Sequence, residues 1–265
     1  MTEVIDMSIN VRRIGKIDVA VLEKEQALSL ALAAVAMRRA YMICFANAHT
    51  VNTARQIDGF SRALQQALVL NDGIGVDLAS RWLYRRPFPA NLNGTDFVPE
   101  VLDRLPGGTR VFLLGGSPGV AERAARAIVA QHDHIEVVGT QHGFFTEEDE
   151  TSLLARIRAS GADIVLAAMG HPRQEMWVAQ NLDRLGVTVM CVGALVDFYA
   201  GTARRAPLWL RRLRLEWIFR LLREPRRLAH RYIIGNAAFL AYIFGSDRRE
   251  GAIQAVPLVH SIKAD

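Results

Sequence analysis

The sequence predicts an α/β protein with a doubly wound, mostly parallel sheet and a basic, amphipathic helical appendage at the C-terminal end. Short apolar runs typical of buried strands alternate with longer runs typical of helices. Turn residues follow most of the apolar runs, and the 265 residues, 51% of them hydrophobic, suit one large domain with an appendage. We expect the α/β domain to span residues 1–200 and the appendage residues 201–265.

The elements follow in order along the chain. Helices are expected at residues 19–39, 50–68 with a break near residue 58, 76–84, 120–131, from 146 onward, and 173–184. Strands are expected at residues 40–46, 110–114, 135–139, 163–169 and 187–192, with a brief apolar approach at 69–70. A loop at 85–93 ends in Gly94-Thr95-Asp96, where Thr95 or Asp96 can cap a following helix.

The stretch from residue 161 to 177 contains one strand-to-helix turn of particular interest. An apolar run ends at Gly170, and Pro172 fits near the N-terminus of the helix that follows. Gln174 and Glu175 then lie in the first helical turn, at the carboxyl end of a parallel strand, where open α/β sheets bind ligands. The N–H groups of such a turn can hold a diphosphate, and an amide side chain can donate or accept. An ordinary turn with a solvated helix start is the alternative.

Three further loops follow predicted strands, at residues 47–50, 71–75 and 115–119. A doubly wound sheet gathers such loops along one edge. Asp72 is the carboxylate among them that follows an apolar approach and precedes a glycine, so it is our candidate general base. A turn-forming Asp-Gly pair is the alternative interpretation. His49 either shares the site or has a structural role.

The glycines at 115, 116 and 119 lack the G-x-G-x-x-G spacing of a dinucleotide site, although they suit close backbone approach to a phosphate or nucleobase. No D-x-D pair and no His/Cys cluster indicates a metal site, and we expect neither a metal nor another cofactor. Cys44 and Cys191 lie in apolar runs without C-x-x-C spacing, which favours reduced core residues.

The last fifth of the chain is basic and aromatic. The net charge is +5, and lysine occurs only at three positions, so arginine provides nearly all the positive charge. Between residues 204 and 231, arginines alternate with Trp, Phe and Leu, a pattern typical of a helix on an anionic membrane surface. A packed helix with a solvated arginine face and a nucleic-acid patch remain alternatives. We expect no signal peptide and no transmembrane helix, since the apolar run 232–244 is too short to span a bilayer.

Taken together and in order, these loops resemble the WecG/TagA/CpsF glycosyltransferases, glycosyltransferase family 26. The matching segments run from about residue 13 to 231 and read FANAHTVNTAR, LNDGIGVDLAS, NGTD, VFLLGGSPGVAERAA, VVGTQHGFF, ADIVLAAMGHPRQEMW, CVGALVDFYAG and RRAPLWLRRLRLEWIFRLLREPRR. Each segment alone is weak evidence, whereas the ordered set is specific.

The resemblance implies a Rossmann-like fold of the GT-E type and an inverting, metal-independent enzyme. Such an enzyme moves a sugar from a UDP-sugar to a polyprenyl-diphosphate-linked sugar. It works as a peripheral protein on the cytoplasmic face of the bacterial inner membrane, with no nucleic-acid partner, and a homo-oligomer is left open. Asp72 matches the family's proposed base, Gln174 an active-site glutamine, and Asn47 the asparagine of the first loop.

Substrate binding is assigned to polar and glycine residues of the loops and to tail arginines that match the family's membrane-docking appendage. The residues are Asn47, His49, Thr50, Asn71, Asn91, Thr95, Asp96, Gly115, Gly116, Gly170, Gln174, Glu175, Arg220, Arg226, Arg227 and Arg231.

Asn91 departs from the family pattern, because many members have arginine there. The segment PANLNGTDF looks more like the branch that builds xanthan-type exopolysaccharide, which adds β-1,4-linked glucose to glucose on the lipid carrier. An N-acetylmannosamine donor, as in teichoic-acid or enterobacterial-antigen synthesis, is the alternative within the family. A nucleotide-binding oxidoreductase and a non-enzymatic membrane adaptor are the alternatives outside it.

Overall fold

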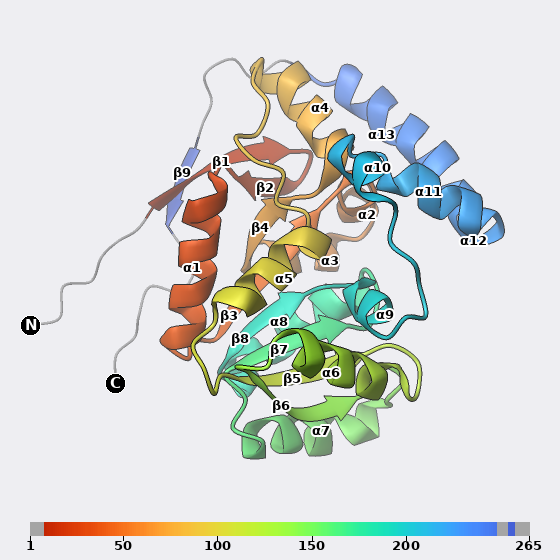
Figure 1. Ribbon diagram of the computed structural model, residues 1–265. Coiled ribbons are helices and arrows are strands. Elements are labelled where there is room, and N and C mark those ends of the chain that lie inside the picture. The colour runs from red at the N-terminus through yellow and green to blue at the C-terminus, as the bar shows by residue number, and fades with distance from the viewer. Residues whose placement is uncertain (1–7, 248–253, 258–265) are drawn as a thin grey trace, which may run out of the picture. The chain divides into compact units, whose positions relative to one another are not determined.

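The computed structural model describes residues 8–247 and 254–257. The chain divides into two compact units, each assembled from segments that are distant in sequence. Unit 1 comprises Met1–Lys24, Phe45–Asn93 and Arg205–Asp265, and unit 2 comprises Glu25–Cys44 and Gly94–Arg204. The strands and helices of both units are labelled in Figure 1.

A six-stranded parallel sheet flanked by helices confirms the predicted doubly wound α/β class. Its strand order is β4-β3-β8-β7-β5-β6. The strands are β3 (Tyr41–Ala46), β4 (Ala67–Asn71), β5 (Arg110–Gly115), β6 (Glu136–Gln141), β7 (Ile164–Ala168) and β8 (Thr188–Cys191). All four residues of β8 and all five of β7 are buried, as continuous apolar runs between two helical layers should be.

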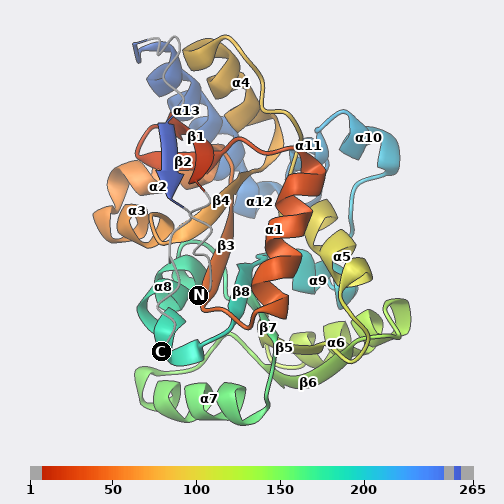
Figure 2. The ribbon, with the colours of Figure 1, turned by 90° about the vertical axis from the view of Figure 1, so that its left-hand side faces the viewer.

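Unit 2 holds most of this sheet and the helices around it. These are α1 (Lys24–Ala36), α5 (Gly94–Arg104), α6 (Val120–Gln131), α7 (Glu147–Ala159), α8 (Arg173–Leu185) and α9 (Leu195–Tyr199). In Figure 2, α6 and α9 lie on one side of β5, β7 and β8, and α8 lies on the other. The expected start of α7 is confirmed, because the Thr146 side chain caps it in a reciprocal capping box with Asp149. Thr95 and Asp96 are not caps, since α5 begins at Gly94 and includes both.

Unit 1 contains α2 (Ala48–Gln56), α3 (Asp58–Leu64) and α4 (Gly73–Tyr84), together with a second sheet. The break expected near residue 58 is the α2–α3 junction at Ile57. The second sheet is antiparallel in the order β2-β1-β9, with β1 (Ser8–Ile14), β2 (Ile17–Ala20) and β9 (Gln254–Pro257). The helix expected at 19–39 was therefore wrong at its start, because Ile17–Ala20 pairs with β1 and the helix begins at Lys24.

The basic tail consists of short helices that belong to unit 1. They are α10 (Leu208–Arg212), α11 (Glu216–Arg223), α12 (Pro225–Ala229), the π-helical turn η1 (His230–Ile234) and α13 (Gly235–Phe244). Whether residues 201–265 form a domain separate from residues 1–200 stays a prediction.

The helix α13 is firmly packed within unit 1. Phe239 is 1% exposed and the Trp82 and Phe244 rings meet edge-on with centroids 4.9 Å apart. The Asn52 amide donates to the Gly235 carbonyl at 2.7 Å. Figure 1 shows α13 alongside α4. The C-terminal part of the tail therefore contributes to the core of unit 1.

The tail preceding α13 is much more exposed. Large apolar side chains of α10, α11 and η1 and of the turn after α10 are more than half exposed: Leu208, Trp209, Leu213, Leu222, Ile233 and Ile234. Within the described part of the chain, none of the helices combines the length and apolar character needed to cross a bilayer.

Candidate active site

Asp72 directly follows the last residue of β4. The strand carries buried Leu70 and Asn71 up to the sheet edge, and the Asp72 N–H donates to the Ala46 carbonyl of β3 at 2.8 Å. Gly73 then takes φ +82°, a conformation that favours glycine, and opens α4. Asp72 occupies the N-cap position, yet its side chain makes no capping hydrogen bond. The carboxylate is therefore turned away from the usual task of a capping aspartate.

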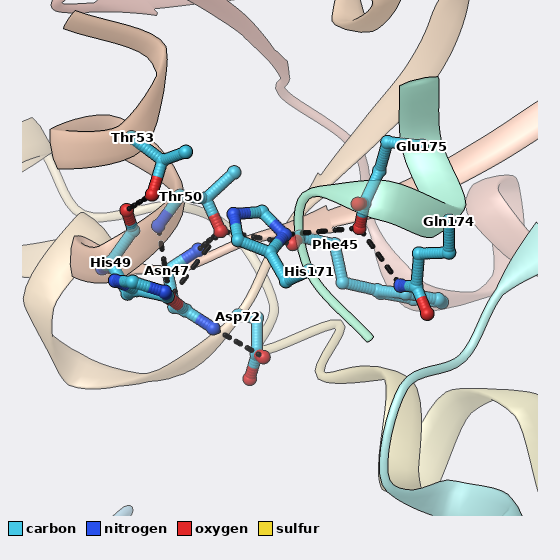
Figure 3. Close-up of polar contacts among 9 residues, drawn as sticks. All are labelled: Phe45, Asn47, His49, Thr50, Thr53, Asp72, His171, Gln174 and Glu175. Atoms are coloured by element: carbon cyan, nitrogen blue, oxygen red, sulfur yellow. Dashed lines mark hydrogen bonds and ion pairs between the residues drawn. The ribbon is translucent and has the colours of Figure 1, made fainter. Parts of the chain in front are cut away.

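Asn47 is the hydrogen-bond donor to this carboxylate. It caps α2, and its Oδ1 accepts from the backbone N–H groups of His49 at 3.0 Å and Thr50 at 3.2 Å. With Oδ1 engaged, Nδ2 faces Asp72 and lies 3.4 Å from Oδ2 (Figure 3). Thr50 completes the capping box by accepting from the Asn47 N–H at 3.1 Å. The Thr50 hydroxyl thus orients Asn47 by hydrogen bonds within their shared loop.

Two other asparagines fasten the Asp72 loop. Asn71 is 1% exposed and donates from Nδ2 to the Ala90 carbonyl at 2.8 Å, and its own carbonyl accepts from Leu92 N–H at 3.2 Å. Asn91 Oδ1 accepts from the Gly73 N–H at 3.1 Å. The segment around Asn91 is therefore hydrogen-bonded to Asn71 and Gly73, the residues on either side of Asp72. This contact makes Asn91 a positioning residue for the Asp72 loop.

Burial, one hydrogen bond and charged residues of the tail determine the pKa of Asp72. Burial raises the pKa of Asp72 although the residue as a whole is only half-buried, and the Asn47 hydrogen bond and the Arg231 and Arg220 guanidinium groups lower it by less. Burial lowers the pKa of the Arg231 guanidinium group. The nearby Tyr232 and Asp72 side chains partly offset this decrease. A carboxylate with a raised pKa holds a proton more readily, as a general base must.

Of the four tail arginines predicted to bind substrate, Arg220 and Arg231 act on Asp72. Arg226 and Arg227 are exposed, and Arg227 pairs with Glu224 on its own helical turn, with Nε and Oε2 2.6 Å apart. The structure therefore groups two of the four with the candidate base.

Sequence reasoning missed two acidic residues that pair with tail arginines. Glu216 opens α11, lies 3.5 Å from Arg205, and raises the pKa of Asp72 through its charge. Asp77 is 4% exposed, accepts from the Phe88 N–H, and pairs with Arg214 of the tail at 3.3 Å. Glu216 is one of only two acids in the arginine-rich run between residues 204 and 231, a signal that could have been used.

A second polar cluster lies in unit 2, at the start of α8. Gln174 and Glu175 are each 3% exposed. Gln174 Nε2 donates to Glu175 Oε1 at 2.8 Å, and His171 Nδ1 lies 3.1 Å from the same oxygen (Figure 3). The alternative interpretation of this turn, a solvated helix start, is wrong at Gln174 and Glu175, because both residues are buried. His171 is a member of this cluster that the sequence did not single out.

The glycines at the ends of β5 and β7 are explained by the local backbone structure. A Cβ on Gly115 would lie 2.3 Å from the Ala168 backbone, so β5 and β7 approach too closely there for any side chain. Gly116 donates from its N–H to the Ala168 carbonyl at 3.0 Å and accepts from the Gly143 N–H at 2.8 Å. Gly170 has φ +84°. Thr95 and Asp96 are half-buried in the first turn of α5.

Cys44 and Cys191 are free and buried, and burial raises the pKa of both thiols, which confirms their prediction as reduced core residues. Among the residues that the structure describes, no group of three or more His, Cys, Asp or Glu could hold a metal ion.

Comparison with protein families gives one match that covers most of the chain. Residues 12–252 match the model described as the glycosyl transferase WecG/TagA/CpsF family. The matched region includes both polar clusters and the arginine-rich tail.

Proposed function

Because the chain belongs to the WecG/TagA/CpsF glycosyltransferase family, we propose that it transfers a hexose from a UDP-sugar to a polyprenyl-diphosphate-linked sugar, with inversion at the anomeric carbon. The family implies a nucleotide-sugar donor and a glycan acceptor. Our specific assignment is UDP-glucose as donor, lipid-linked glucose as acceptor and a β-1,4 linkage, in exopolysaccharide synthesis.

The observation that carries this proposal is the environment of Asp72. It is a carboxylate with a raised pKa, at the carboxyl end of a parallel strand and withheld from helix capping. In the proposed reaction the acceptor hydroxyl oxygen attacks the anomeric carbon and Asp72 takes the hydroxyl proton. The bond between the anomeric carbon and the UDP oxygen breaks, and its electron pair leaves with the diphosphate. Attack opposite the leaving group inverts the configuration.

Arginines supply the counter-charge for the leaving diphosphate in this proposal. Arg231 and Arg220 are close enough to Asp72 to affect its pKa. Guanidinium groups bind phosphate oxygens in a bidentate way, and such fixed charges stabilise a developing anion without a metal. We therefore expect turnover to persist in EDTA.

The exposed apolar side chains of the tail support the acceptor assignment. A polyprenyl-linked diphosphate lies at the level of the lipid headgroups, so the enzyme must reach that plane. Trp209, Leu213 and Leu222 are 57–76% exposed, and arginines alternate with them. Apolar side chains add interfacial burial, and each basic residue near an anionic leaflet contributes about 1 kcal/mol. We propose peripheral attachment to the cytoplasmic face of the inner membrane.

A donor screen tests the proposal. Purified enzyme is incubated with UDP-glucose, UDP-N-acetylmannosamine and other UDP-sugars, together with a short-chain polyprenyl-diphosphate-glucose acceptor. The product linkage and anomeric configuration are then determined by NMR. Transfer from UDP-glucose with a new β linkage is the expected result. Transfer from UDP-N-acetylmannosamine would redirect the specific assignment, and a retained configuration would remove Asp72 as the proposed base.

A further inference from the structure

The cluster at the start of α8 fixes which way the Gln174 amide faces. An ionised carboxylate only accepts hydrogen bonds, whereas a primary amide has a donor end and an acceptor end. Glu175 Oε1 lies 2.8 Å from the Gln174 side-chain nitrogen. The amide nitrogen must therefore face Glu175, and the Gln174 carbonyl oxygen must face away from it. His171 reinforces this arrangement, because its Nδ1 lies 3.1 Å from the same carboxylate oxygen.

The oxygen that faces away is left unsatisfied. Within residues 8–247 and 254–257, no group donates to Gln174 Oε1 or to the neighbouring Glu175 Oε2, although both atoms are buried and each residue is only 3% exposed. A buried acceptor without a donor is costly, and in native proteins it calls for an explanation. A donor from outside the chain, placed directly or through one bound water, would supply the missing hydrogen bond.

We propose that His171 and Glu175 are positioning residues that present Gln174 Oε1 as an acceptor for a hydroxyl group of the UDP-sugar donor. This inference rests on the proposed function and adds a specificity rule to it. The ligand must carry an O–H at the position that meets Gln174, since a group that only accepts leaves Oε1 unsatisfied. The hydroxyl belongs either to the transferred hexose or to the ribose.

Ligand analogues separate an accepting Gln174 from a donating one. Removing the contacting hydroxyl and replacing it by fluorine both eliminate the donated hydrogen, so both should lower affinity about ten-fold or more. If the amide instead donates to the ligand, the fluorine, which can accept weakly, should retain more affinity than hydrogen. Monodeoxy and monofluoro UDP-hexoses test the hexose, and 2′-deoxy- and 2′-fluoro-UDP-hexoses test the ribose. Binding is read by thermal shift and titration calorimetry, independently of turnover.

A matched pair of substitutions tests the positioning residues. Glu175→Gln offers an amide that can donate to Gln174 Oε1 and so consumes the acceptor, and we expect at least a ten-fold loss in UDP-hexose affinity. Gln174→Glu places two carboxylates together, which must share a proton, so binding should move to lower pH. Gln174→Glu combined with Glu175→Gln restores one carboxylate and one amide, with a carboxylate oxygen facing the ligand. The double variant should recover to within about three-fold of the wild type.

The outcomes distinguish this inference from the proposed function. Recovery in the double variant, together with an analogue penalty that disappears in Gln174→Ala, supports the inference. If the wild type binds and turns over a UDP-hexose but no analogue is penalised, or fluorine rescues the deoxy loss, the inference is overturned while the function stands. If the wild type accepts no UDP-sugar, the proposed function fails first. Gln180→Glu, on an exposed position of the same helix, is the control for the amide-to-carboxylate change.

Discussion

Replacing Asp72 by asparagine should abolish most turnover and at the same time stabilise the fold. Asparagine has the same shape, and its amide oxygen can still accept from Asn47, which lies 3.4 Å from Asp72 Oδ2 in the wild type. The amide cannot take the acceptor proton. Loss of a positioned general base typically lowers the rate by about 10²- to 10⁴-fold. UDP-sugar binding should largely remain, because the arginines are unchanged.

The stability effect follows from the direction of the Asp72 pKa. Burial, the largest cause, raises the pKa in the folded state above its value in the unfolded chain. The folded state then binds more protons, so wild-type stability falls as pH rises from the unfolded pKa through the folded one. A ten-fold difference in proton affinity between the two states corresponds to about 1.4 kcal/mol of unfolding free energy. Each kcal/mol moves the Tm of a domain of 150–250 residues by roughly 2–4 °C.

The expected result is a Tm difference that depends on pH. Asp72→Asn should melt above the wild type at pH 7 to 8, and the two curves should converge towards pH 4. Differential scanning fluorimetry across this range, beside turnover of a water-soluble acceptor, measures both effects. Asp183→Asn, an exposed carboxylate on α8, is the control. Near-normal turnover in Asp72→Asn, or a variant less stable than wild type at pH 8 but equal at pH 4, would refute the reasoning.

Three further results are expected. Arg214→Ala removes the ion pair with buried Asp77 and should lower both Tm and kcat, with exposed Arg212→Ala as control; unchanged kcat would mean that this contact does not position the tail. Trp209→Ala should reduce co-sedimentation with anionic vesicles roughly ten-fold, since the ring is 61% exposed, whereas Trp217→Ala, which loses a ring contact with Tyr232, should mainly lower Tm. Turnover should persist in excess EDTA, and activity that returned only with added magnesium or manganese would contradict the arginine assignment.

Much of the fold could be predicted because it depends on local patterns. The helix α6 matches its expected bounds, 120–131, since its periodic apolar residues begin directly after a glycine turn. The strands β3 and β7 were placed to within a residue or two, because continuous apolar runs mark buried parallel strands. The local β1–β2 hairpin was misread as the start of a helix, and β9 was missed because it pairs with β1, more than 240 residues away in sequence. No local pattern specifies such a partner.

The candidate site was predictable in its loops but not in its contacts. The rule that parallel strands gather their following loops at one edge brought Asn47 and Asp72 into one site, and they form a hydrogen bond. It could not show that Thr50 serves Asn47 as a capping partner, or that Asn91 bonds the Gly73 N–H. Those roles depend on which atoms are already occupied.

The contribution of each tail arginine to the site could not be predicted from charge alone. Ten arginines between residues 204 and 231 look equivalent as a pattern, but the fold gives them different surroundings. Arg214 takes φ +59° between α10 and α11 and pairs with Asp77 on α4. Two residues later α11 begins with Glu216, and the same helix carries Arg220. Because α4 starts directly after Asp72, the Arg214–Asp77 pair links the tail to the helix that follows the base. Arg220 and Arg231, which affect the pKa of Asp72, and the exposed Arg223, Arg226 and Arg227 all follow Arg214, so the fold and not the spacing decides which arginines reach the base.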